Sequence, residues 1–147
     1  MYRGIVFLAC FILASCQLMD SGSTSDAGHT EADLAVLIAG TWQLESVGGN
    51  TVNPDLQAHL AFNSPSKLAG NSGCNQFVGR YSIDGNVLQI ADNLATTRKM
   101  CLPGIMQIEQ RLLQALQGQW RVEVVNDQLV FIDEHGKPQL QARKVIE

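Results

Sequence analysis

Short runs in which apolar and polar residues alternate make up most of the chain after residue 40. Alternation of this kind predicts strands with one buried face, and the Gly, Asn and Asp residues between the runs are typical of antiparallel turns. The predicted strands cover residues 41–47, 58–62, 67–70, 76–83, 86–91, 120–125, 129–132 and 139–145. In the first of them, Trp42 and Leu44 fall on one face, and Ser46 is the next position on that face. Asp84-Gly85, between two later strands, predicts a hairpin whose central residues take positive φ.

The segment from Pro103 to Gly118 has a different period. Its apolar residues recur at spacings of three and four, which predicts one apolar stripe on a helix: Ile105, Ile108, Leu112 and Leu116. Proline suits the first turn of a helix, and glycine suits its end. We expect the stripe to face the core, with a partner-binding surface as the alternative. Many strands with one late helix predict a mainly β domain, an antiparallel barrel-like sheet with the helix packed on it or plugging it.

The first fifteen residues predict a signal peptide. Arg3 precedes an apolar run over 5–13, which is shorter than the roughly 20 residues that span a bilayer. The run ends in Leu13-Ala14-Ser15-Cys16, which resembles the lipobox of bacterial lipoproteins. The alternative is an ordinary secretory peptide with a cysteine at its end. We expect residues 1–15 to be removed and Cys16 to become an acylated N-terminus that inserts into membrane lipid.

The residues after Cys16 predict a flexible tether. Residues 20–30 are small and polar, so they cannot bury enough apolar surface to offset the entropy of ordering. We assign 16–36 to the lipidated cysteine and tether, and 37–147 to one folded domain. By resemblance to lipoproteins, in which Asp after the cysteine signals inner-membrane retention, Gln17 points to the outer membrane, facing the periplasm.

The charge pattern argues against nucleic acid as a partner. The chain has 10 Lys and Arg against 14 Asp and Glu, a formal net charge of −4. Its longest basic cluster is Arg98-Lys99, whereas nucleic-acid binding calls for clustered cations.

Two sequence clusters carry a resemblance to a known family. The first is Gly-x-x-Gly-Cys-Asn-x-Phe-x-Gly-x-Tyr over 70–81, and the second is Thr-Thr-Arg-Lys-Met-Cys over 96–101. With Gly40-Thr41-Trp42 upstream and Glu109 downstream, they resemble the META (HslJ-like) domain family over 40–143. Lys99, between Arg98 and Met100, is a small departure at a position that varies in the family.

The resemblance implies a small β-barrel-like domain of lipocalin-like topology with one helix. Members of the family are commonly periplasmic or outer-membrane lipoproteins. Some are linked to heat stress or antibiotic tolerance, and others to secretion or motility. No catalytic activity is established for the family, so the resemblance supplies no active site.

Cys74 and Cys101 are the two cysteines of the expected folded domain. An even pair in an oxidising compartment predicts a disulfide. Two reduced buried thiols, or a reactive or metal-binding thiol, are the alternatives. A nucleophilic thiol needs a nearby base, and no histidine lies close to either cysteine in sequence.

Among the polar motif residues, Asn75, Arg80, Arg98 and Glu109 are the candidates for interaction or structural roles. We expect Asn75 to bond backbone groups through its side chain. We expect Arg98 to pair with Glu109 and fix the helix against the sheet, with a ligand or partner surface as the alternative. Ser72 lacks the surroundings of a nucleophile elbow or a phosphate loop. No zinc-type or calcium-type spacing is present in the sequence.

These features favour a non-enzymatic envelope lipoprotein that has no cofactor and acts through contacts with an envelope protein. The alternative is a carrier of a small apolar ligand inside the barrel, where Trp42 and Trp120 would line a cavity. An interior packed by the strand residues would disfavour a carrier: Leu44, Leu60, Phe62, Leu88 and Ile90.

Overall fold

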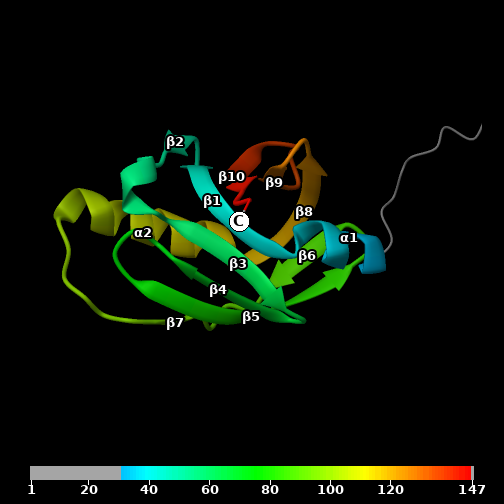
Figure 1. Cartoon of the computed structure of the whole chain (residues 1–147), viewed down its shortest axis with the longest axis horizontal. Helices are drawn as coiled ribbons and strands as arrows, with labels where there is room; N and C mark the ends of the chain where they lie inside the picture. The colour runs from blue at the N-terminus through cyan, green and yellow to red at the C-terminus, as the bar shows by residue number, and fades with distance from the viewer. Residues whose placement is uncertain (1–30, 147) are drawn as a thin grey trace, which may run out of the picture.

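The computed structural model describes residues 31–146 as a β-barrel with two α-helices (Figure 1). The helices are α1 (Glu31–Ile38) and α2 (Pro103–Leu116), with a 3₁₀ turn η1 (Pro54–Leu56). The strands are β1 (Gly40–Val47), β2 (Asn50–Thr51), β3 (His59–Ser64), β4 (Lys67–Asn71), β5 (Gln76–Asp84), β6 (Val87–Ile90), β7 (Ala95–Thr96), β8 (Gly118–Val125), β9 (Gln128–Ile132) and β10 (Pro138–Lys144).

Eight antiparallel strands close into the barrel, in the order β1-β3-β4-β5-β6-β8-β9-β10. Pairing of β10 with β1 completes the ring, with Trp42 opposite Lys144 and Val47 opposite Leu140. The two-residue strands β2 and β7 pair only with β1 and β5, respectively. The mainly β, barrel-like fold expected from the sequence is therefore confirmed. Closure leaves the main strands no open edge for another chain to extend.

The interior of the barrel is filled by side chains from alternate strand positions. The five interior residues expected from the sequence are between 0% and 3% exposed: Leu44, Leu60, Phe62, Leu88 and Ile90. Trp42 is also buried, and its indole Nε1 donates a hydrogen bond to the Ile38 carbonyl at 2.7 Å. Trp120 points inward from β8, is partly buried, and stacks on Phe131 with ring centroids 6.4 Å apart.

A β-bulge in β1 moves the inward-facing position away from Ser46. The register against β10 shifts between Leu44 and Ser46, because a bulge adds one residue to one strand only. Val47 is buried as a result, while Ser46 is partly exposed and donates a hydrogen bond to Gln141. The expectation that strict alternation would place Ser46 beside Leu44 was wrong.

The predicted hairpin between β5 and β6 is present, with its turn shifted by one residue. Asp84 pairs with Val87, so Gly85 and Asn86 are the central turn residues. Gly85 has a φ of 60°, a conformation that glycine adopts without steric strain.

Helix α2 confirms the helix predicted after Pro103. Leu112 and Leu116 are fully buried, and Ile108 packs against the same core. Three of the four residues of the predicted stripe therefore pack on the core, as expected, while Ile105 is partly exposed and lies outside the core cluster.

Helix α1 was not expected from the sequence. Its Leu34 and Ile38 are 2% and 0% exposed and belong to the barrel core. Figure 1 shows α1 and α2 towards opposite ends of the barrel. The described packing thus begins a few residues upstream of the boundary expected at residue 37.

The expected signal peptide (1–15), the acylated Cys16 and the first part of the tether lie outside the described residues. Within 31–146, neither helix has the length and apolar character needed to cross a membrane.

Replacing Leu34 by Ala should lower the free energy of unfolding by about 2–4 kcal/mol, because the change leaves a cavity in the core. Val36, on the same helix, is 76% exposed, so Val36→Ala should change it by less than about 0.5 kcal/mol. Urea denaturation of both variants measures the difference. Equal effects would show that α1 contributes no core packing.

Candidate functional site

The turn between β4 and β5 contains the two buried polar residues of the described chain, Ser72 and Asn75. Between them, Gly73 has a φ of 94°, which strongly favours glycine, and its N–H donates to the Asn71 side chain at 2.7 Å. This local geometry turns the Ser72 and Asn75 side chains toward the segment after β7 and toward α2.

The Asn75 side chain connects three parts of the chain. Its Oδ1 accepts hydrogen bonds from the Lys99 backbone N–H at 2.7 Å and from Thr97 Oγ1 at 2.8 Å. Its Nδ2 lies 3.1 and 3.0 Å from the two carboxylate oxygens of Glu109 on α2. The expectation that Asn75 bonds backbone groups is therefore confirmed, and its amide also binds a carboxylate that the sequence did not pair with it.

Glu109 is held by this turn rather than by arginine. Ser72 Oγ donates to Glu109 Oε2 at 2.7 Å and accepts the Asn75 backbone N–H at 3.0 Å. Arg98 is exposed, and among the described residues its guanidinium forms no ion pair with Glu109. The expected Arg98–Glu109 pair was wrong because two buried neutral donors already occupy the carboxylate.

A disulfide joins the same segments covalently. Cys74 and Cys101 are bonded, with their Cα atoms 6.1 Å apart and a sequence separation of 27. The predicted disulfide is present. The two alternatives, a pair of reduced buried thiols and a reactive or metal-binding thiol, do not apply to these cysteines in the bonded state. Closing a loop of this length stabilises the fold by about 3–4 kcal/mol in the chain-entropy model. We call Ser72, Asn75, Glu109 and the Cys74–Cys101 disulfide the motif clamp.

The chemistry available to the motif clamp is structural. Ser72 is 1% exposed, and its hydroxyl contacts a carboxylate and backbone groups instead of an imidazole. His59 is opposite Asn71 in the β3–β4 register, but its Nδ1 bonds the Gln57 carbonyl, and His135 lies beside Glu134. No group of three metal-ligating side chains occurs in residues 31–146.

Two motif glycines are needed for close packing. A Cβ at Gly70 would lie 2.2 Å from the His59 carbonyl oxygen and 2.4 Å from the Phe77 ring. A Cβ at Gly79 would lie 2.2 Å from Leu94 Cδ2. The backbone contact means that position 70 requires a residue without a side chain, whereas at position 79 a Cβ would force the Leu94 side chain to move.

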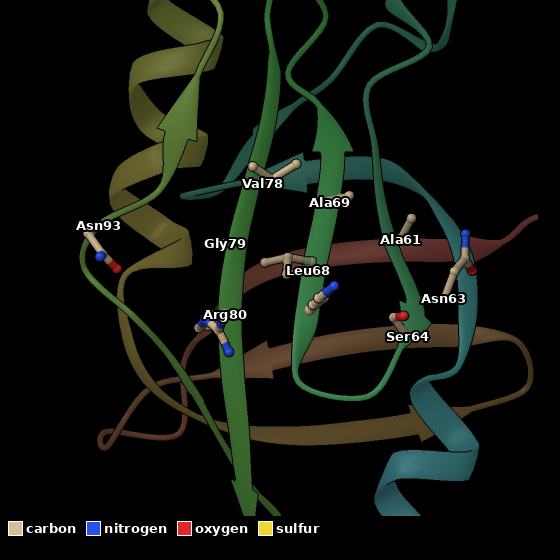
Figure 2. Close-up of a pocket in the computed structure, with 10 residues that line it drawn as sticks. Ala61, Asn63, Ser64, Leu68, Ala69, Val78, Gly79, Arg80 and Asn93 are labelled. Atoms are coloured by element: carbon tan, nitrogen blue, oxygen red, sulfur yellow. The ribbon is translucent and has the colours of Figure 1, made fainter.

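Arg80 lies outside the motif clamp, at a hollow on the outer surface of β3, β4 and β5 (Figure 2). The hollow has a volume of about 540 Å³. Ala61, Ala69 and Val78 are neighbours in register across the three strands and form its small apolar floor. Lys67 is opposite Arg80 in the β4–β5 register, so two cations share one side of the hollow. We call this hollow the outer groove.

The outer groove is polar at its rim but contains no carboxylate. Its other polar lining residues are Asn63, Ser64 and Asn93. On the inner side of the same strands, Tyr81 packs edge-on against Phe62 with ring centroids 5.3 Å apart, and burial raises the pKa of its phenol. Sequence reasoning missed Lys67 and the groove. The available signal was the recurrence of small residues at the outward positions of three successive strands.

The architecture defines a closed antiparallel β-barrel with helices packed on it. Solved structures with the same fold include an NMR structure with 24% identity and a TM-score of 0.59, the match covering 74% of this chain and 91% of the other. An NMR structure of a protein from Burkholderia xenovorans has 21% identity and a TM-score of 0.63, covering 89% and 99%. A search of curated proteins gave no match. The chain belongs to the META domain family, whose model matches residues 33–145, and the resemblance carried by the two motif clusters is thereby confirmed.

Replacing Glu109 by Ala should lower the free energy of unfolding by about 2–3 kcal/mol, because Ser72 and Asn75 lose their acceptor in a buried site. Arg98→Ala should change it by less than about 0.5 kcal/mol, because the side chain is exposed and unpaired with Glu109. Urea denaturation of the oxidised protein measures both. An equal decrease in the free energy of unfolding for the two variants would indicate that Arg98 and Glu109 do pair and hold α2 against the sheet.

Proposed function

We propose that this META-domain protein is a non-enzymatic lipoprotein of the bacterial envelope, anchored in the outer membrane through acylated Cys16 and facing the periplasm. It supports envelope or stress functions through contacts with another envelope protein. The lipobox-like sequence before Cys16 and the secretory character of residues 1–15 support the anchor. The disulfide supports an oxidising compartment.

The filled barrel favours action through the outer surface. Core side chains occupy the interior, so a small-ligand carrier has no support there. The polar residues of the motif clamp are engaged with one another, which leaves them no free group for a substrate. The larger hollows described on the molecule open outward.

The outer groove is the surface that carries the proposal. Its floor of small side chains lets an extended segment approach the sheet closely, while Lys67 and Arg80 supply positive charge on one side. An acidic segment of a partner protein complements this surface. The absence of a carboxylate among the lining residues means that no internal ion pair competes for the two cations.

The partner is tested by crosslinking in intact cells, with a photoreactive amino acid in place of Val78 in the groove. We expect a discrete adduct with one envelope protein, because Val78 is 55% exposed on the groove floor. The matched control places the same amino acid at Val125, which is 60% exposed and not in the groove. Charge reversal, Lys67→Glu with Arg80→Glu, should reduce the adduct at least fivefold. The same adducts from both positions would contradict a partner site in the groove.

The anchor is tested by the intact mass of protein purified from membranes. We expect the mass of residues 16–147 plus acyl groups, and Cys16→Ala should abolish the acylation. A non-acylated mature protein would refute the lipoprotein assignment while leaving the groove experiment unaffected.

A further inference from the structure

Large apolar side chains are exposed in the segment between β7 and the first turns of α2. Met100 is 94% exposed, Leu102 73% and Met106 45%. Residues 31–146 include eight such exposed large apolar residues, and three of them lie within residues 100–106. Moving these side chains out of water would be favourable. We call residues 98–106 the tip.

The tip is held in this exposed conformation by the motif clamp. Asn75 binds both the N–H and the carbonyl of Lys99, at 2.7 and 3.3 Å, directly before Met100. The disulfide fixes Cys101 directly after it. Past Leu102, the backbone N–H groups of Ile105 and Met106 donate to its carbonyl at 2.9 and 3.1 Å. Met100 and Leu102 are therefore fixed on the surface and cannot turn into the core without breaking these bonds.

The charge around the tip is positive in a chain of net negative charge. Within residues 98–106 the charged residues are Arg98 and Lys99, none is acidic, and the next acidic residue along the chain is Glu109. The Glu109 carboxylate is bound by Ser72 and Asn75. Arg98 and Lys99 are exposed and immediately precede Met100. The most exposed apolar side chain thus lies directly beside two cations.

We infer that the tip is a contact site for an anionic lipid bilayer. Met100 and Leu102 would enter the headgroup–acyl boundary, while Arg98 and Lys99 would meet lipid phosphates, the arrangement by which peripheral proteins bind membranes. Figure 1 shows the start of α2 and the chain leading into it at the extreme end of the molecule. Because this end projects beyond the barrel, it can contact the flat surface of a bilayer. A protein partner would need a concave site that encloses it.

The expected strength of this contact is modest. Attraction of the two cations to an anionic surface is weak, and partial insertion of Met100 and Leu102 adds to it. A contact of this size is transient for a free protein. It would orient the barrel when the chain is already held near the membrane, because tethering raises the effective concentration of the surface.

The experiment measures tryptophan quenching by brominated lipid, using the full-length protein with vesicles of phosphatidylglycerol and phosphatidylcholine. Met100→Trp places a probe on the tip without disturbing packing, and Val125→Trp is the matched exposed control. The fluorescence of the wild-type protein, due to Trp42 and Trp120, is subtracted. Brominated phosphatidylglycerol should quench the Met100→Trp signal at least twofold and leave the Val125→Trp signal unchanged. Equal quenching of the two variants would overturn the inference.

Two further arms identify what covers the tip. Arg98→Glu with Lys99→Glu, in the Met100→Trp background, should remove most of the quenching, and so should vesicles of phosphatidylcholine alone. Quenching that persists in both arms would overturn the role of anionic lipid. Protection of Met100→Trp from aqueous acrylamide without quenching by brominated lipid would show that protein covers the tip, which would also overturn the inference.

Discussion

The hydrogen bonds of Asn75 are the interaction on which the rest of the structure depends. The Asn75 amide binds the backbone N–H and carbonyl of Lys99 and the carboxylate of Glu109 on α2. It therefore joins residues that are more than twenty positions apart in sequence. Because Asn75 is 4% exposed, its amide would otherwise lack a partner, at a cost of about 1–3 kcal/mol. The disulfide joins the same segments by a covalent bond. Together they fix the direction in which the chain leaves β7 and begins α2.

This constraint decides where function can reside. Leu112 and Leu116 of α2 complete the core, so the apolar face of this helix is in use, and buried strand side chains occupy the interior of the barrel. The polar residues of the motif clamp are hydrogen-bonded to one another. What distinguishes this surface from an ordinary solvated one is the pair of cations over small side chains on β3–β5, and the exposed apolar residues next to Arg98 and Lys99. Both features are positive regions of a chain with net charge −4.

Alternation and turn residues predicted the barrel strands and α2 because those signals are local. The disulfide followed from an even number of cysteines in an expected oxidising compartment. The bulge in β1 was not predictable, because it depends on pairing with β10 at the far end of the chain. Glu31 and Asp33 in the first turn of α1 are a helix-start signal, but eight residues are too few for a clear apolar period, so α1 was missed. The helix gains stability by packing Leu34 and Ile38 on the core. The outer groove and the true partners of Glu109 arise from register between separate elements, which sequence spacing does not contain.

The β5–β7 pairing relates the two surfaces to each other. Val78 of the groove floor pairs with Ala95, and the next residue pair, Phe77 and Thr96, leads into Thr97 and the tip. Two residue pairs therefore connect the groove floor to the segment that leads into the tip. The tip additionally needs the disulfide and the Lys99 bonds, whereas the groove lies on strands that the barrel holds by itself. Reduction of Cys74–Cys101 would accordingly loosen the tip and leave the groove in place. The outer groove and the tip are thus connected through the pairing of β7 with β5, but different interactions stabilise them.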